Sequence, residues 1–251
     1  MATLLLLAVQ SVPSDEDAER ALKELRKALQ ESGDDVKIAA IKTALKVDHE
    51  TVIKAVGELL TSGTDPVRSA GALALGEVDH PASVAALTAA IQANRKKPSN
   101  LGAIARALGQ LGWESAAAPL HDLMEDSGDR DIRECLGDIV RAVGQIGSAT
   151  SVKPLQDLNM RLKDSDEAGR KAALRVNPAL EQIAIRKEDK REGRTGFSAK
   201  WWKENQERLL ALAKRTYWSK KTHQRTVVEP GAKAPPDSVL VGVRITDRPE
   251  K

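Results

Sequence analysis

The sequence of 251 residues is poor in cysteine, in aromatic side chains and in long apolar runs. Its single Cys cannot form a disulfide within the chain, which excludes a disulfide-stapled scaffold. No apolar run approaches the roughly twenty residues that are needed to cross a bilayer. Gly-rich phosphate loops, His-Glu-x-x-His pairs and Gly-x-Ser-x-Gly turns are absent as well. With 2% aromatic residues, the core has to be built from Ala, Leu, Val and Ile, which is unusual for an ordinary globular enzyme.

The formal net charge of +3 conceals a division of the chain by charge and aromatic content. Residues 1–183 contain 22 Lys and Arg against 27 Asp and Glu, a balance of −5, whereas residues 184–225 contain 13 against 5, a balance of +8. Five of the six aromatic residues also fall within 184–225, namely Phe197, Trp201, Trp202, Tyr217 and Trp218. The sequence therefore combines an acidic, aromatic-poor body with a basic, aromatic-rich segment, and partners respond to such local fields.

The first ten residues, MATLLLLAVQ, resemble the apolar core of a secretory signal. They lack a basic region in front, and Gln10 is too large for a good cleavage site. One interpretation is that residues 1–13 are a truncated signal segment and that the protein is exported, to the periplasm or beyond the cell. The alternative is a short apolar segment that packs on the first helix of a cytoplasmic protein.

A short sequence motif of the Ala-Leu-Gly type, which is expected at the end of a helix, occurs four times along the body of the chain. Its markers, spaced by 30, 33 and 35 residues, are Leu45, Leu75, Leu108 and Val143. Each marker precedes a short polar turn and a second amphipathic stretch, and these stretches are 51–60, 82–91, 115–124 and 150–162. Their apolar residues recur at intervals of three and four, which is the helical period. Two helices per repeat with no strand between them predict an α-solenoid.

Proline and glycine occupy positions that fit this interpretation. Pro66 and Pro81 each stand where a helix is expected to begin, since proline lacks the N–H that is not needed there. Three glycines, Gly112, Gly128 and Gly147, stand where helices are expected to end in a left-handed cap. Within the helices, Gly137 and Gly144 are best explained by close helix packing.

The run DPVRSAGALALGEV at residues 65–78, followed by HPASVAAL at 80–87, resembles a HEAT repeat of the bacterial, phycobilisome-lyase-like kind. The resemblance covers about residues 34–163, and more loosely 14–33 and 166–185. It implies a helical-repeat fold and an interaction scaffold. The repeats depart from the family pattern at Lys46, which replaces a Gly, and at Trp113-Glu114, which replaces Asp-Pro. No pocket residues of the lyase members can be matched, so that chemistry is not carried over.

The basic segment resembles, at residues 195–205, a Thr-Gly and Trp motif that follows many exported bacterial HEAT arrays. We expect a helix over 199–216 to cap the last repeat with a stripe that includes Trp202 and Leu209. The same segment could instead hold a polyanion, since aromatic stacking beside a basic track is how single-stranded nucleic acid is bound. The candidate binding residues are Lys200, Trp201, Lys203, Arg215, Tyr217, Trp218, Lys220 and Lys221.

The tail shows a different pattern. Val239, Val241, Val243 and Ile245 alternate with other residues, which predicts a strand. Residues 226–228 could pair with this strand as a hairpin across 230–236. Because two strands alone are marginal in water, the tail either packs on the last helices, docks on a partner or stays disordered.

Two features could have indicated a metal site or a catalytic residue. The turns Asp48-His49 and Asp79-His80 occupy matching positions in adjacent repeats, and helix N-capping explains them more simply than a metal site. Cys135 lies among apolar residues at helical spacing, so we expect a buried thiol and not a nucleophile.

We therefore expect an all-α fold, a right-handed α-solenoid of about four HEAT-like helical hairpins with a preceding N-terminal helix. A C-terminal capping helix and a short β-like or disordered tail would follow. The expected organisation is a signal segment at 1–13, a repeat array at 14–185, a basic capping segment at 186–225 and a tail at 226–251.

The expected function is a non-catalytic, exported scaffold that binds a protein partner through its concave solenoid surface, across the second helices. The alternative is nucleic-acid or other polyanion binding through residues 184–225, and an enzyme related to the lyase-type members is a third hypothesis. We expect a monomer without a cofactor, a metal site or a membrane span.

Overall fold

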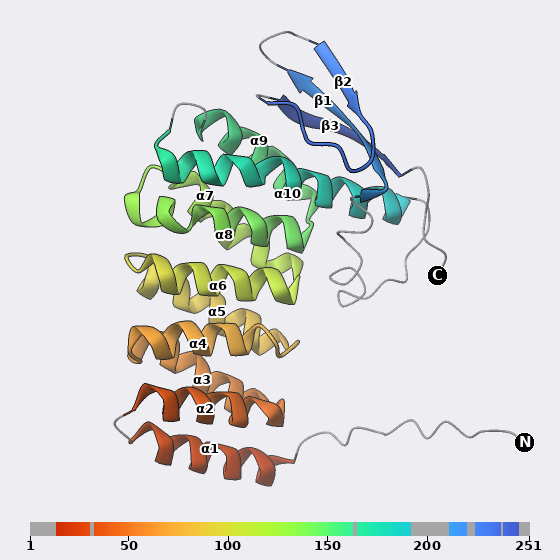
Figure 1. The fold of residues 1–251 in the computed structure, drawn as a ribbon. Helices are drawn as coiled ribbons and strands as arrows, with labels where there is room; N and C mark the ends of the chain where they lie inside the picture. The colour runs from red at the N-terminus through yellow and green to blue at the C-terminus, as the bar shows by residue number, and fades with distance from the viewer. Residues whose placement is uncertain are drawn as a thin grey trace, which may run out of the picture.

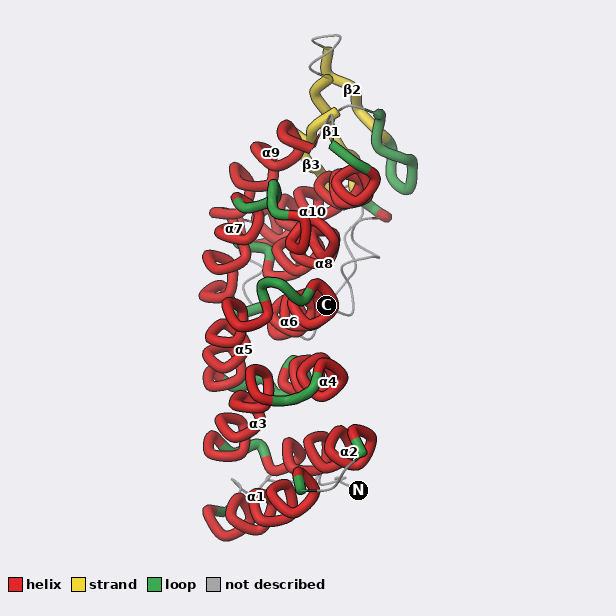
Figure 2. Tube along the Cα trace, turned by 90° about the vertical axis from the view of Figure 1, so that its left-hand side faces the viewer, coloured by secondary structure: helices red, strands yellow, loops and turns green. Residues whose placement is uncertain are grey.

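The computed structural model is a stack of helices in two layers, with a small sheet at the C-terminal end (Figure 1). It describes residues 14–30, 33–162, 165–191, 211–219, 224–236 and 238–245. One layer consists of α1 (Asp15–Leu29), α3 (Glu50–Ser62), α5 (Pro81–Asn94), α7 (Ala117–Glu125) and α9 (Val152–Arg161). The other consists of α2 (Asp34–Ala44), α4 (Asp65–Leu75), α6 (Pro98–Leu111), α8 (Arg130–Ile146) and α10 (Glu167–Arg191). Figure 2 shows the layers as two columns, and the α-solenoid prediction is confirmed.

The repeat predicted from the sequence corresponds to four helix pairs, α2–α3, α4–α5, α6–α7 and α8–α9, with α1 in front of them. All four marker residues are buried at the ends of even-numbered helices or just beyond. Short 3-10 turns follow three of these helices, η1 (Leu45–Val47), η2 (Glu114–Ala116) and η3 (Ala149–Ser151). Gly112 and Gly147 end α6 and α8 with φ of 70° and 68°, as predicted for left-handed caps. The same prediction is wrong for Gly128, which does not have a positive φ.

Close contacts between glycine and alanine hold the even-numbered helices together. A Cβ atom at Gly76 would lie 2.8 Å from the Cα of Ala107, and one at Gly144 would lie 2.8 Å from the Cα of Ala179. The intermediate pair, Gly109 and Ala142, is equally close. Glycine is required at such positions because any side chain would overlap the neighbouring backbone. The packing role predicted for Gly144 is thus confirmed.

The odd-numbered layer has one comparable contact among the described residues, between Gly57 and Ala86. Such close contacts are thus more frequent among the first helices of the pairs than among the second helices, which were expected to bind the partner.

The tail forms a three-stranded antiparallel sheet of β1 (Ala213–Ser219), β2 (Gln224–Val228) and β3 (Ser238–Ile245), in the order β2-β1-β3. The strands predicted at 226–228 and 239–245 are confirmed, but they do not pair with each other, because β1 lies between them. The helix predicted over 199–216 is wrong at 213–216, which belong to β1, and its residues 199–210 lie outside the described part of the chain. The expected boundary at 225/226 falls within β2, so the two C-terminal segments share one sheet.

The sheet packs on α10 through a buried polar cluster. Arg215 donates from Nη1 to Oε2 of Glu181 over 3.0 Å, and the Tyr217 hydroxyl donates to the other oxygen of the same carboxylate. Asn177 on α10 also donates from Nδ2 to the carbonyl of Ser238 on β3, over 2.9 Å. Burial raises the pKa of Glu181, while the charge of Arg215 acts in the opposite direction. The small three-stranded sheet is thereby anchored on α10.

Candidate interaction surface

A groove of ≈ 720 Å³ lies between α3 and α5, in the layer of odd-numbered helices. We call it the α3–α5 groove. It is lined by Glu50, Lys54, Gly57, Glu58, Thr61, His80, Pro81, Ala82, Ala85, Ala86, Ala89 and Ala90. No charged residue occurs anywhere in α5, although Ala85 and Ala89 are exposed on its surface. A charge-free helix face in contact with solvent is an unusual feature of this otherwise charged chain.

The floor of the groove is rigid because α3 and α5 pack closely beneath it. A Cβ atom at Gly57 would lie 2.8 Å from the Cβ of Ala86, so the two helices approach each other without intervening side chains. Below this contact, Val56 and Leu60 on α3 and Leu87 on α5 are fully buried. The groove is therefore shallow, with methyl groups along its α5 wall.

Charge in the groove comes from α3 alone. Lys54 forms a 2.6 Å ion pair between its Nζ and Oε1 of Glu50, one turn away, and this contact lowers the pKa of Glu50. Glu58, one turn further along, is exposed and takes part in no ion pair among the described residues. Among the Asp, Glu, Lys and Arg side chains, the lining has two carboxylates against one ammonium, which is a formal charge of −1.

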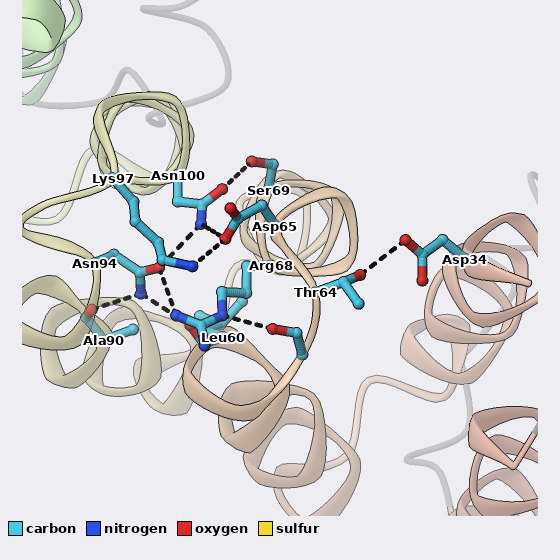
Figure 3. Close-up of polar contacts among 11 residues, drawn as sticks. Asp34, Leu60, Thr64, Asp65, Arg68, Ser69, Ala90, Asn94, Lys97 and Asn100 are labelled. Carbon is cyan, nitrogen blue, oxygen red and sulfur yellow. Dashed lines mark hydrogen bonds and ion pairs between the residues drawn. The ribbon is translucent and has the colours of Figure 1, made fainter. Parts of the chain in front are cut away.

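The C-terminal ends of α3 and α5 are joined by a buried asparagine (Figure 3). Asn94 ends α5 and donates from Nδ2 to the carbonyl of Leu60 on α3 over 2.8 Å and to that of Ala90 over 2.9 Å. Its Oδ1 accepts from Nη1 of Arg68 at 3.3 Å and from Nδ2 of Asn100 at 3.2 Å. Both asparagines are almost fully buried, so these bonds satisfy groups that would otherwise be costly to bury.

The same network continues into the neighbouring repeats (Figure 3). Asp65, at the start of α4, accepts from Nζ of Lys97 at 2.5 Å and from Nδ2 of Asn100 at 2.9 Å. Thr64 donates to Oδ2 of Asp34 on α2 over 2.9 Å. The loops at this end of the groove are thus tied to three even-numbered helices, and the groove keeps its shape without a ligand.

A second hollow, of ≈ 430 Å³, lies between α8 and α10. Its small-residue floor includes Gly137, with Arg175 lying across that glycine. Two of the surrounding charges are already paired, Arg133 with Asp166 at 2.9 Å and Asp138 with Arg106 at 2.8 Å. Because these charges of both signs largely neutralise one another, this hollow is a weaker candidate than the α3–α5 groove.

The Asp-His turns are helix caps, as the sequence indicated. His49 and His80 precede α3 and α5, and Nδ1 of each accepts from a backbone N–H two residues later, at 3.3 Å and 3.0 Å. Asp79 accepts instead from the indole N–H of Trp113 at 2.7 Å, which links two successive turns. In the described ranges, no group of three or more His, Cys, Asp and Glu could hold a metal ion.

The eight candidate polyanion-binding residues are not brought together on a described surface. Arg215 and Tyr217 are buried, 8% and 0% exposed, because they pair with Glu181 under the sheet. These two assignments are therefore corrected: both residues are structural. The remaining candidates lie outside the residues or side chains that the structure describes, namely Lys200, Trp201, Lys203, Trp218, Lys220 and Lys221.

Cys135 on α8 is buried as expected, and burial raises the pKa of its thiol to about 12. Nε2 of His121 on α7 lies 2.7 Å from the hydroxyl of Ser151, and burial lowers the pKa of His121.

The α3–α5 groove was not predicted from the sequence. The available signal was the absence of charge over 81–94, a segment that was interpreted only as one of the amphipathic second helices.

The family model of HEAT repeats matches residues 65–137, from the start of α4 to the middle of α8. This match supports the HEAT-repeat resemblance inferred from the same region. A search of curated proteins found no match to the chain. No helix in the described part of the chain is both long and apolar enough to span a membrane.

Proposed function

We propose that this HEAT-repeat array is a non-catalytic scaffold that recognises a protein partner through the α3–α5 groove. The observation that carries the proposal is the charge-free alanine wall of α5, exposed to solvent beside a charged α3. Exposed apolar surface of this kind marks sites of protein contact. The proposed surface lies on α3 and α5, the second helices of their pairs, which the sequence led us to expect as the binding side.

Preorganisation supports the proposal. Asn94 fixes the C-terminal ends of α3 and α5, and the contact of Gly57 with Ala86 fixes their separation. A groove that is already rigid loses little conformational entropy when a partner binds, and more of the contact energy then appears as affinity.

Site-specific photo-crosslinking in the native cell tests the proposal. A photoreactive amino acid is placed at Ala85 or at Ala89 in the groove, or at Ala93 as a control. Ala93 is exposed on the same helix but does not line the groove. We expect one discrete crosslinked protein from positions 85 and 89, and none from position 93.

A second control position, Leu174 on α10, is 78% exposed on the other layer. Crosslinks that form at 174 but not at 85 or 89 would place recognition on the layer of even-numbered helices and refute the groove. An Ala85→Arg variant, tested with the photoreactive residue at 89, should lose the crosslink while keeping its helix content.

We also propose that the protein is exported, on the strength of the leucine-rich residues 1–10. Cell fractionation with an intact mass measurement tests this proposal. A new N-terminus between about residues 10 and 14 in an envelope or extracellular fraction is expected. A cytoplasmic protein with an intact N-terminus would refute it.

A polyanion contact remains a hypothesis for the basic segment, supported by its charge balance of +8 over residues 184–225. It predicts that single-stranded RNA binds and that affinity falls steeply with rising salt. Lys220→Glu combined with Lys221→Glu should weaken that binding and leave the groove crosslinks unchanged.

A further inference from the structure

We infer that the occupant of the α3–α5 groove is an amphipathic helix of the partner, with small apolar residues along one face and Lys or Arg beside them. The inference rests on the proposed function and names the chemistry of its ligand. Three features lead to it: the backbone chemistry of the walls, the shape of the floor and the position of the acidic groups.

The walls exclude an extended peptide as the preferred occupant. Both walls are α-helices, whose backbone N–H and C=O groups are bonded within each helix. An extended segment gains affinity by adding main-chain hydrogen bonds to a sheet edge, and this groove offers none. A helix satisfies its own backbone bonds and needs only a complementary face.

The floor suits a helix that approaches closely. Ala82, Ala86 and Ala89 follow one another at intervals of four and three along α5, and each contributes only a methyl group. The lining residues of α5 run from Pro81 to Ala90, which gives the groove a length of roughly 15 Å at 1.5 Å per residue, or nearly three helical turns. A partner helix with Ala, Ser or Val on its contact face can lie along this row at the shorter interaxial distances seen in proteins.

Charge determines what flanks the apolar face. Glu58 is exposed beside the groove without an ion-pair partner among the described residues, and α5 offers no charge that could compensate it. A cation on the partner therefore gains favourable contacts here, whereas an acidic flank would be repelled.

A second copy of this chain fits the groove poorly. Helix α1 carries four basic residues, among them Arg20 and Lys23, but also five acidic ones, and its apolar residues Ala18 and Leu25 are already buried against its own array. Docking α1 of another copy would require that helix to leave its place. Self-association is therefore an outcome that the experiment must be able to detect.

The test is selection from a displayed library of 18-residue helices, with Ala, Ser or Val on one face and randomised flanks, against the full-length protein. We expect the selected pool to be enriched in Lys and Arg over the starting library. Binding of a selected peptide should fall at least tenfold in Ala85→Arg and stay unchanged in Ala93→Arg, the matched control on the same helix.

Charge is tested separately. Glu58→Lys should weaken the selected peptides about three- to tenfold, more at low salt, whereas Glu125→Lys on α7 should not. Circular dichroism verifies that each variant is folded, which is expected because all four positions are exposed.

A pool without basic enrichment, or binding that Ala85→Arg leaves intact, would overturn the inference. Groove crosslinks at 85 and 89 would then still support the proposed function with another ligand chemistry. If sedimentation detects dimers of the unaltered protein that are absent in Ala85→Arg, the inference is overturned in favour of a second copy as the occupant. If groove crosslinks are absent too, the proposed function also fails.

Discussion

At Gly109, a Cβ atom would lie 2.7 Å from the Cα of Ala142, closer than real Cβ atoms approach a backbone. The equivalent glycines one repeat earlier and one repeat later, Gly76 and Gly144, make the same contact with the next even-numbered helix. The Ala-Leu-Gly motif of the repeat therefore sets the distance between successive helices. Its alanine and leucine fill the core, and its glycine sets how near the next helix lies.

Replacing Gly109 by alanine should destabilise the protein, although alanine favours helices more than glycine does. The overlap with α8 forces a backbone shift, and we expect a loss of about 1–3 kcal/mol in the free energy of unfolding. Urea denaturation measures this loss. Gly128→Ala is the control, since nothing lies within 4 Å of its added Cβ and its φ is not positive. Equal stability of the two variants would contradict the spacing role.

Cys135 gives a pH-dependent prediction. Burial raises its pKa to about 12 from an ordinary value of 9.0, so the thiol stays protonated in the fold while the unfolded chain ionises. The unfolded state then binds fewer protons between these values, and stability falls as pH rises from about 9 to 12. Cys135→Ala should show a flatter decline over this range, although it is less stable at pH 7. Parallel curves for the two proteins would refute the assignment.

At the scale of elements, the junction of α10 with the sheet depends on one buried carboxylate. Glu181 receives Arg215 and Tyr217 from β1, and both partners are 34 or more residues away along the chain. Arg215 also donates to the carbonyl of Ala232 beyond β2, so one guanidinium joins a helix, a strand and a loop. These polar contacts act together with apolar packing, because Tyr217 and Leu240 belong to the same hydrophobic cluster as Leu180 on α10.

Glu181→Ala should release the sheet. It leaves the Arg215 guanidinium buried without its carboxylate, which costs about 3–5 kcal/mol in comparable cases. We expect rapid proteolysis within 211–245, while residues 33–162 remain protected. The double variant Glu181→Leu with Arg215→Met removes both charges and should restore much of the protection. Equal sensitivity of the single and double variants would mean that the ion pair does not anchor the sheet.

The repeat helices could be predicted because their apolar residues keep the helical period, and the strand at 238–245 because its valines alternate. Strand β1 could not be predicted in the same way. Its buried face consists of Ala213, Arg215 and Tyr217, and a buried arginine looks polar until its partner Glu181 is known. The groove could not be predicted from the alanines of α5 for a related reason. Alanine is common in cores, and whether it is exposed depends on the neighbouring helices.

At the scale of the whole molecule, each helix pair contacts only its neighbours. Successive turns are joined in the same local manner, for example by Trp113 to Asp79 at 2.7 Å and by Ser148 to Glu114 at 2.8 Å. Stability in such an array is the sum of the units and of the interfaces between neighbours. A perturbation should therefore remain local.

Gly144→Ala tests this locality. Its Cβ would meet Ala179 on α10, so hydrogen exchange should accelerate in α8, α10 and the sheet. Exchange in α1 to α3 should stay unchanged, because two interfaces or more separate them from the altered contact. Mass spectrometry of exchanged peptides measures both regions. A uniform acceleration would show that the array unfolds as one cooperative unit.

The sheet on α10 also has a consequence for how copies of the molecule meet. Each end of a stack of helical hairpins exposes the same kind of helix surface that packs between hairpins within the stack. Two copies could therefore stack head to tail, and a contact of this kind does not close on itself. Repeated, it would produce fibres. The strands lie against the C-terminal part of α10 and replace helical ridges there with a pleated surface that does not match a further hairpin of this type. We therefore expect this end of the molecule to act as a barrier to polymerisation.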